Sequence, residues 1–333
     1  MKRFDVALKR WLYIPVILII LGLLQWACSA LLLDGPIQQG PYYYQILILA
    51  GINIILAVSL NLTNGVAGQF SIGHAGFFAV GAYAAACISV YGGPALGLMG
   101  NAGSTGGPQG AALLVIACMC GALAAAIAGL VVGIPSLRLR GDYLAIVTLG
   151  FGEIIRVLIL NIEAVGGARG FIGIPRLSNF FWVAGGAVAA ILTVRNLVRS
   201  GYGRALLSIR EDEIAAQAMG IPVTRYKVMA FVISAAFAGL AGGLFGHFTM
   251  YLHTNSFTFV KSFEIIIMIA LGGLGSLPGA VLGAIVITVL PELFREFAEY
   301  RMVIYSLALI LIMIFRPQGL LGNTSLLGRK RGK

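Results

Sequence analysis

Charge is scarce in this sequence of 333 residues. Asp, Glu, Lys and Arg make up 11% of it, against about a quarter in an ordinary soluble domain, and none of them occurs between Gly35 and Leu137. Hydrophobic residues account for 59%. A soluble protein could not bury so much apolar surface, whereas bilayer crossings of about 20 residues each would use it. The composition indicates an all-α polytopic membrane protein and excludes soluble enzymes, nucleic-acid-binding proteins and disulfide scaffolds.

Several catalytic and metal-binding motifs are also absent. The sequence contains no His-Glu-x-x-His and no Gly-x-Ser-x-Gly, which mark zinc proteases and serine hydrolases. Its one Gly-Lys pair, Gly332-Lys333, lacks the pattern of a phosphate-binding P-loop. The four cysteines lie in apolar stretches, as is typical of small core residues. The chain is therefore predicted to be no enzyme and to hold no metal and no cofactor.

Ten apolar segments are predicted to cross the membrane within a single transmembrane domain, residues 1–333. One long segment is interrupted by glycine and proline at Gly272–Gly279, where we expect the chain to break. Backbone groups freed at membrane depth must find partners inside the protein. The predicted spans are residues 11–33, 42–62, 68–91, 111–135, 143–161, 179–194, 229–253, 263–275, 278–290 and 302–315.

The distribution of Lys and Arg predicts the orientation. If both termini are cytoplasmic, the inner segments hold 17 of the 23 Lys and Arg residues and the outer segments hold five, with Arg156 inside a span. Positive residues accumulate on the cytoplasmic side. Nine spans would place the basic carboxyl-terminal tail outside, which fits the rule less well.

Polar residues and glycines gather between Asn61 and Gly76, near a membrane boundary. Such backbone is tolerated at membrane depth only when it is buried in protein or faces a water-filled cavity. Gly73, His74 and Gly76 are therefore candidates for a translocation pathway. The alternative for His74 is a hydrogen bond to a neighbouring helix.

Charged residues within predicted spans carry information because they are costly there. Glu153 and Arg156 lie three residues apart and can pair on one helix face, and Lys261 and Glu264 repeat this spacing. Each pair is either a structural ion pair or a polar site for a zwitterionic solute or a proton relay. Glu153 and Arg156 are thus further pathway candidates.

The longest hydrophilic stretch is residues 195–227. Within it, Gly203–Gly220 is predicted to form one cytoplasmic helix, with Leu207, Ile214 and Ala218 on one face. Gly220 is expected to end this helix. It is either an amphipathic connector or a helix that docks into a partner's groove.

Four motifs resemble one known family, the branched-chain amino acid permeases of ABC importers. They are Ser71-Ile-Gly-His-Ala-Gly-Phe-Phe-Ala-Val-Gly-Ala-Tyr83, Gly141-Asp-Tyr-Leu-Ala-Ile-Val-Thr-Leu-Gly150, Glu213-Ile-Ala-Ala-Gln-Ala-Met-Gly220-Ile-Pro and Gly272-Gly-Leu-Gly-Ser276. The resemblance covers about Ile48 to Gly319, and it is the order of the four motifs that makes it specific. Urea permeases of ABC importers share much of the pattern, so the resemblance defines the family better than the solute.

The resemblance implies a fold similar to that of type II importer permeases, such as the cobalamin importer, with two inverted halves. It also implies that Glu213, Ala215, Ala216 and Gly220 contact an ATPase. The implied partners are two ABC ATPases, which would bind the ATP, a second homologous permease and a periplasmic substrate-binding protein. The implied location is the bacterial inner membrane.

Two rival functions remain open at this stage. An ion-coupled secondary transporter would use Glu153, Arg156 or Glu264 to carry a proton or an ion. A channel is disfavoured because no Asn-Pro-Ala pore signature occurs.

Overall fold

The computed structural model describes residues 20–33, 40–95, 97, 107–136, 141–293, 306–307, 310, 314 and 319–321. Among these residues the regular structure is helical, apart from one antiparallel bridge between Phe171 and Leu252. Seven segments are long and apolar enough to cross a membrane: Gly40–Val66, His74–Ala95, Pro108–Ser136, Asp142–Asn161, Phe180–Arg199, Val223–Thr249 and Thr254–Gly272. Two shorter apolar helices cover Ile20–Leu32 and Leu277–Leu293. The chain is a multi-pass α-helical membrane protein, as the composition predicted.

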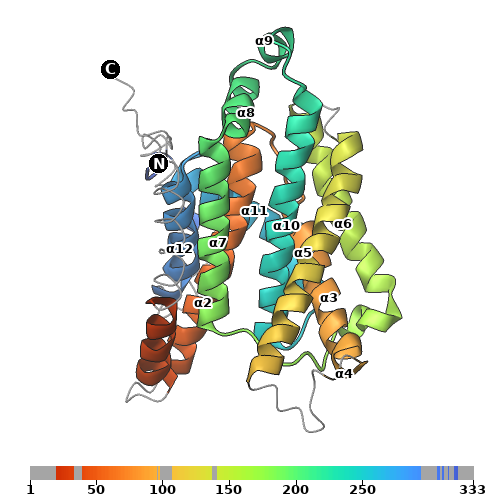
Figure 1. Ribbon diagram of the computed structural model, residues 1–333, viewed down its shortest axis with the longest axis vertical. Coiled ribbons are helices and arrows are strands. Elements are labelled where there is room, and N and C mark those ends of the chain that lie inside the picture. The colour runs from red at the N-terminus through yellow and green to blue at the C-terminus, as the bar shows by residue number, and fades with distance from the viewer. Residues whose placement is uncertain are drawn as a thin grey trace, which may run out of the picture.

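Successive apolar helices run in alternating directions (Figure 1). They are α2 (Gly40–Asn61), α3 (His74–Cys87), α5 (Pro108–Ser136), α6 (Asp142–Asn161), α7 (Phe180–Arg199), α10 (Val223–Thr249), α11 (Phe259–Gly272) and α12 (Leu277–Leu293). The hydrophilic helices α8 (Gly201–Glu211) and α9 (Glu213–Ala218) project at one end, and α4 (Gly93–Ala95) lies at the other. The remaining short helices are η1 (Ser29–Leu33), η2 (Leu62–Val66), η3 (Ile88–Gly92), η4 (Glu163–Val165), η5 (Gly167–Arg169) and η6 (Thr254–Phe257).

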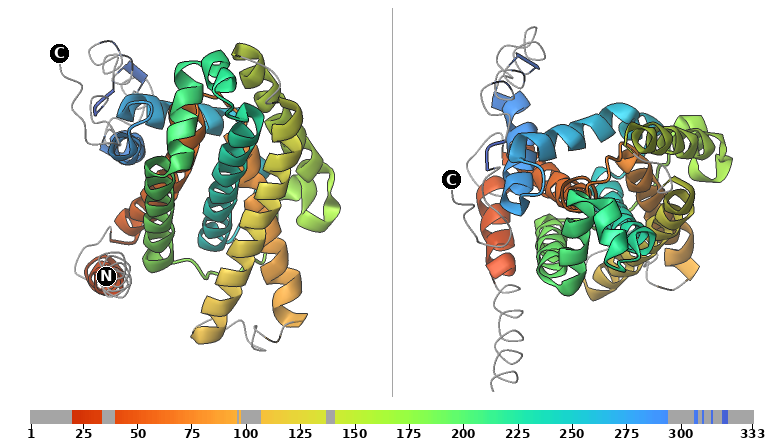
Figure 2. Two further views of the ribbon diagram at one scale, coloured as in Figure 1. Left: turned by 45° about the horizontal axis from the view of Figure 1, so that its top comes forward. Right: turned by 90° about the horizontal axis from the view of Figure 1, so that it is seen from above.

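The most extensive helix packing joins α3, α5 and α10, and Figure 2 shows the bundle from two further directions. A Cβ atom added at Gly81 of α3 would lie 2.1 Å from the Cα of Gly239 in α10. One added at Gly242 would lie 2.2 Å from the carbonyl oxygen of Phe78. These helices therefore touch backbone to backbone, the close packing that small residues permit in lipid.

The helices overlap the predicted spans from residue 42 to residue 290, although several of their ends differ by a few residues. The predicted break after Gly272 is confirmed, because α11 ends there and α12 begins at Leu277. The start of the third predicted span, residues 68–73, is wrong, since α3 begins only at His74. The predicted single helix at residues 203–220 is also wrong, since α8 and α9 replace it. Most of the span at 302–315 and the first part of the span at 11–33 lie outside the described residues, so the total of ten stays a prediction.

Candidate functional site

The hydrophilic segment between α7 and α10 breaks at Asp212. This residue adopts an extended conformation (φ −153°, ψ 111°) that ends α8. Its carboxylate Oδ1 accepts hydrogen bonds from the backbone N–H groups of Ile214 (2.9 Å) and Ala215 (3.0 Å). An Asp in this position satisfies donors that a helix start leaves open. Asp212, a residue type that favours the cap of a helix, thus indicated that a second helix begins here. The continuous apolar face predicted for Leu207 and Ile214 does not form, because these residues lie on different helices.

The outer surface of α9 presents apolar side chains to the surroundings. Ile214 is 70% exposed and Met219, which follows the helix, is 82% exposed. Of the residues predicted to contact an ATPase, Ala215 and Gly220 are exposed and Glu213 is half-buried, whereas Ala216 is buried. Two of the four candidates, Ala215 and Gly220, are thus accessible, and the contact with an ATPase stays a prediction.

Buried contacts attach α9 to the beginning of α10. Ala216 packs in a small apolar cluster with Ile209 and Val223, and Lys227 Nζ donates to Glu213 Oε2 at 2.8 Å. Gly220 has a φ of +80°, so this residue ends α9 as predicted, in a conformation that favours glycine. The helix pair and α10 therefore form one continuous structure.

A second attachment joins α8 to α10 through two tyrosines. The rings of Tyr202 and Tyr226 stack with centroids 4.7 Å apart, and the Tyr202 hydroxyl donates to the carbonyl oxygen of Tyr226 at 2.6 Å. Burial, reinforced by Tyr226, raises the pKa of Tyr202 to about 12. The hydroxyl therefore remains a donor throughout the physiological pH range.

Arg210 connects α8 to the membrane-spanning part. Its Nη1 donates to the carbonyl oxygen of Gly65 at 2.8 Å, and its side-chain stem lies so close to Gly68 that a Cβ there would be 2.7 Å from Cγ. A Cβ at Gly275 would lie 3.2 Å from Nη1. One arginine thus touches both places where the spanning helices are interrupted, after α2 and after α11. Sequence analysis missed this role, because nothing local relates Arg210 to Gly65.

The two interruptions are also fastened directly to each other. Asn61, which is fully buried, accepts a hydrogen bond at Oδ1 from the N–H of Gly275 (2.8 Å) and donates from Nδ2 to the carbonyl oxygen of Ser276 (3.3 Å). A Cβ added at Gly65 would lie 2.4 Å from the Gly275 nitrogen. Asn61 therefore supplies partners to backbone groups that have left the helix.

The non-helical residues between η2 and α3 form a closed loop. The side chain of Asn64 accepts from the N–H of Ser71 and donates to its carbonyl oxygen, both at 3.2 Å. Gly68, with a φ of +69°, supplies the left-handed turn. Most of the loop is buried, which agrees with the expectation that polar backbone at this depth is enclosed by protein.

The predicted pathway residues at the start of α3 lie at its contacts with neighbouring helices. A Cβ at Gly73 would lie 2.2 Å from the Thr148 carbonyl oxygen, and one at Gly76 would lie 2.9 Å from the Cα of Gly152. His74 is buried, with Nε2 2.9 Å from the hydroxyl of Ser59. Their role in a pathway stays a prediction.

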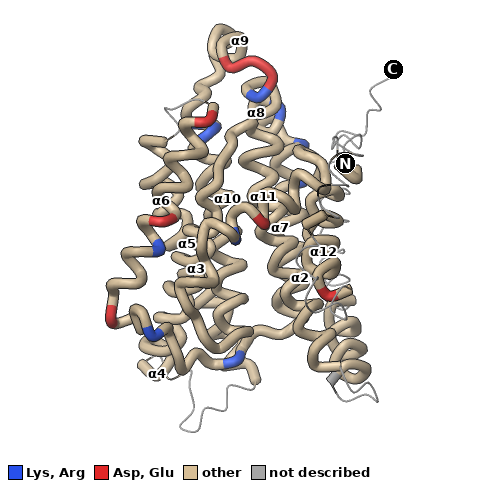
Figure 3. The backbone as a smooth tube through the Cα atoms, turned by 180° about the vertical axis from the view of Figure 1, so that it is seen from behind, with Lys and Arg blue, Asp and Glu red and all other residues tan. Residues whose placement is uncertain are grey.

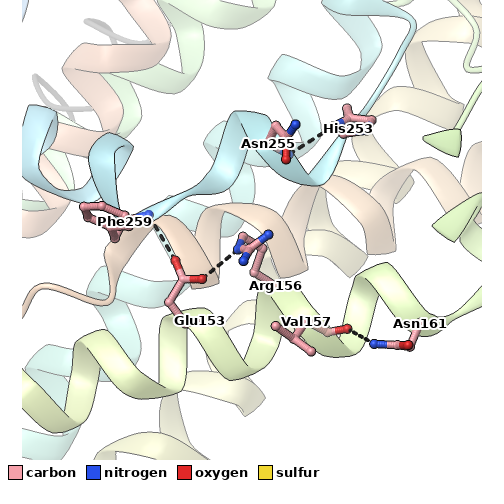
Figure 4. A network of polar contacts seen from close by, with 7 residues as sticks. All are labelled: Glu153, Arg156, Val157, Asn161, His253, Asn255 and Phe259. Carbon is pink, nitrogen blue, oxygen red and sulfur yellow. Dashed lines mark hydrogen bonds and ion pairs between the residues drawn. The ribbon is translucent and has the colours of Figure 1, made fainter. Parts of the chain in front are cut away.

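Glu153 and Arg156 form a partly exposed ion pair on α6 (Figure 4), with Arg156 Nε 2.7 Å from Glu153 Oε2. The other carboxylate oxygen accepts from the N–H of Phe259 at 3.2 Å, at the amino-terminal end of α11. Because Glu153 lies near the middle of α6, α11 begins near the mid-depth of that helix. A carboxylate at a helix amino terminus is electrostatically favourable. This contact supports the alternative in which Glu153 and Arg156 form a structural ion pair.

These features define the class of protein. It is a polytopic α-helical membrane protein with a hydrophilic, charged helix pair, α8 and α9, at one end of the bundle and further charged residues along its length (Figure 3). A family model described as "Branched-chain amino acid transport system / permease component" matches residues 42–315. The chain belongs to this family.

Its relatives include permeases from bacteria and an archaeon. The high-affinity branched-chain amino acid transport system permease protein LivM of Salmonella typhimurium is 41% identical over 237 residues, which cover 61% of this chain and 56% of that protein. LivH of the same organism is 32% identical over 164 residues, 48% of this chain and 52% of that protein. A probable LivM of Methanocaldococcus jannaschii is 26% identical over 239 residues, 64% and 69% of the two chains. The match thus spans little more than half the length of the Salmonella relatives, and no solved structure matches the chain.

Proposed function

We propose that this chain is a membrane-spanning permease subunit of an ATP-driven ABC importer for branched-chain or related hydrophobic amino acids. Two partner ATPases bind the ATP, a second homologous permease completes the pore, and a periplasmic binding protein delivers the solute. The complex lies in the bacterial inner membrane, with α8 and α9 and both termini of this chain in the cytoplasm. Membership of the permease family supports this proposal, as do relatives named both LivM and LivH.

The observation that carries the proposal is the connection from α9 to the interrupted helices. Ile214 and Met219 offer an apolar surface of the kind that docks into a partner's groove. A force applied there reaches α10 through Glu213–Lys227 and reaches the interruption after α2 through Arg210. ATP-driven movement of the ATPases would therefore shift the two interruptions relative to the rest of the bundle and switch access between the two sides.

The finer fold proposal is a ten-span permease of type II with two inverted halves. The two interruptions support it, because each half then contributes one broken element, and the two meet at Asn61 and Gly275. Irregular backbone lining a central site is the arrangement that transporters with inverted repeats use.

Charge exchange tests the contact between Glu213 and the ATPase. Glu213→Lys alone removes the ion pair with Lys227. A loss of uptake in this variant could therefore come from a less stable protein or from a lost contact with the ATPase. The double variant Glu213→Lys/Lys227→Glu restores an internal pair while reversing the charge offered to the ATPase. In proteoliposomes that contain the ATPases and the binding protein, we expect both variants to lose ATP-driven leucine uptake.

Two outcomes would contradict the coupling proposal. Recovery of uptake in the double variant would mean that Glu213 acts only within this chain. Uptake of leucine driven by a proton or sodium gradient without the ATPases would favour a secondary transporter. Uptake of urea without leucine would move the chain to the urea-permease alternative.

A further inference from the structure

An open groove of about 780 Å³ lies where the end of α5 meets the beginning of α10 and the chain that follows α9. Helices α5 and α10 pack against each other (Figure 1). The residues that line the groove are apolar except for Gln217, Thr224 and Arg225. These three precede the apolar residues that α10 contributes, so the polar groups are confined to the end of the groove nearest α9.

One face of α10 supplies both the apolar floor of the groove and a cation. Arg225, Met229 and Val232 lie at positions i, i+4 and i+7 and therefore share a helix face. Arg225 is exposed, and it makes no hydrogen bond or ion pair with the other described residues. Thr224 beside it is exposed as well and adds a hydroxyl donor. The groove thus presents an available guanidinium at one end of an apolar surface.

The wall of the groove formed by α5 continues a stripe of exposed apolar side chains. Along α5 these residues recur every three or four positions and so lie on one face. They are Ile116, Met119, Leu123, Ile127, Leu130 and Ile134, of which the last two line the groove. An exposed stripe of this kind on a spanning helix suits contact with acyl chains.

The lengths of the two helices place the groove near a membrane surface. Helix α10 has 27 residues and α5 has 29. At about 1.5 Å per residue both exceed the hydrocarbon core, which is about 30 Å thick. Their terminal turns, with Arg225 in the first turn of α10, therefore reach the depth of the lipid head groups.

We propose that this groove binds a phospholipid whose head group carries a net negative charge. The phosphate pairs with Arg225, and one acyl chain runs over Met229 and Val232 toward the exposed stripe of α5. Basic pockets between spanning helices near the membrane surface recognise anionic lipids in this way. The inference goes beyond the proposed function and does not depend on the identity of the solute.

A segment of an ATPase is the other occupant to consider, because α9 lies close by. The apolar residues that we assign to the ATPase contact, Ile214 and Met219, are not part of the groove. The groove opens instead onto the side of α5 that carries the exposed apolar stripe. A lipid accounts for this continuity and for the cation together.

The test measures lipid binding to the full chain purified in a neutral detergent. Native mass spectrometry gives the dissociation constant of the first lipid bound, for phosphatidylglycerol and for phosphatidylcholine with the same acyl chains. We expect the wild type to bind phosphatidylglycerol about fivefold more tightly, the factor that one arginine near the surface supplies. Arg225→Gln should lose this preference. Equal binding of the two lipids by the wild type overturns the inference.

The matched control is Arg199→Gln, which removes an exposed arginine at the end of α7, outside the groove. This variant should keep the wild-type preference for phosphatidylglycerol. An equal loss of preference in both arginine variants would mean that the anionic lipid responds to the positive charge of the chain as a whole. That result also overturns the inference.

A second pair of variants tests the apolar part of the groove without changing charge. Met229→Trp places an indole ring in the space that the acyl chain needs, and we expect phosphatidylglycerol to bind about fivefold more weakly or worse. Met119→Trp adds the same ring to the exposed stripe of α5, outside the groove, and should bind this lipid as the wild type does. Unchanged binding by Met229→Trp counts against the site.

The same titration on the chain assembled with its ATPases distinguishes the two occupants. A lipid site should still bind phosphatidylglycerol with the preference that depends on Arg225. If assembly abolishes this binding, a segment of the ATPase fills the groove and the assignment to a lipid is wrong.

Discussion

Replacing Arg210 by methionine tests whether α8 transmits movement to the interrupted helices. Methionine keeps an unbranched apolar stem against Gly68 and removes the hydrogen bond from Nη1 to the Gly65 carbonyl oxygen. A hydrogen bond from a charged group contributes about 1.5–3 kcal/mol. The Arg210 side chain is 36% exposed, so water competes and about 1 kcal/mol is the better figure. The pair with Glu211 is more exposed still and adds little.

A loss of about 1 kcal/mol cannot unfold a protein of this size, so Arg210→Met should assemble normally. The same energy, when it is the coupling between two elements, corresponds to about a fivefold change in their linked equilibrium. We therefore expect ATP hydrolysis to continue while leucine accumulated per ATP falls about fivefold.

Proteoliposomes assayed for hydrolysis and uptake in the same sample measure this ratio directly. The matched control is Arg199→Met, an exposed arginine at the end of α7, which should keep the wild-type ratio. An unchanged ratio in Arg210→Met would refute the transmission role. A fall in hydrolysis and uptake together would point to the assembly with the ATPases instead.

Three further changes test the bundle that supports this coupling. Asn61→Leu leaves the Gly275 N–H without its partner, whereas the Ser276 carbonyl oxygen keeps the hydrogen bond from the Ala280 N–H. We expect a loss of about 1–3 kcal/mol, seen as a lower midpoint of denaturation in detergent. Gly239→Val would place a side chain against Ala125 and the Gly121 carbonyl oxygen, so the yield of folded protein after membrane extraction should fall sharply. In the control, Gly185→Val, no heavy atom lies within 4 Å of the added Cβ, and the protein should be extracted in normal yield. Tyr202→Phe keeps the ring stack and loses one hydrogen bond, with an expected cost of about 1 kcal/mol. Because the pKa of Tyr202 is about 12, its hydroxyl is protonated both folded and unfolded below about pH 9, so that cost should not vary between pH 6 and pH 9 in denaturation curves.

The sequence predicted those features that depend on local composition. Apolar length located the spans, and the glycines around Gly272 located the interruption after α11. The interruption after α2 was anticipated only as polar, enclosed backbone. Its loop is closed by the side chain of Asn64 and the backbone of Ser71, a tertiary detail that no periodicity encodes.

Features that depend on contacts between distant segments could not be predicted from the sequence. Glu153 was correctly paired with Arg156, because three residues separate them on one helix. Its second bond, to the N–H of Phe259, joins residues 106 apart, and the bond from Arg210 to Gly65 spans 145. The break at Asp212 is a different case. Its capping residue was visible, but the apolar spacing around it favoured a continuous helix.

The hydrogen bonds between the two interruptions couple their movements. If the two breaks were independent, each would expose backbone N–H and C=O groups to water or lipid. Leaving such groups without partners at membrane depth costs free energy. Here Asn61 takes its partners from the chain after α11, and Gly65 contacts Gly275 without intervening side chains. Neither break can move alone without giving up those bonds. A displacement delivered through Arg210 must therefore shift the end of α2 and the end of α11 together.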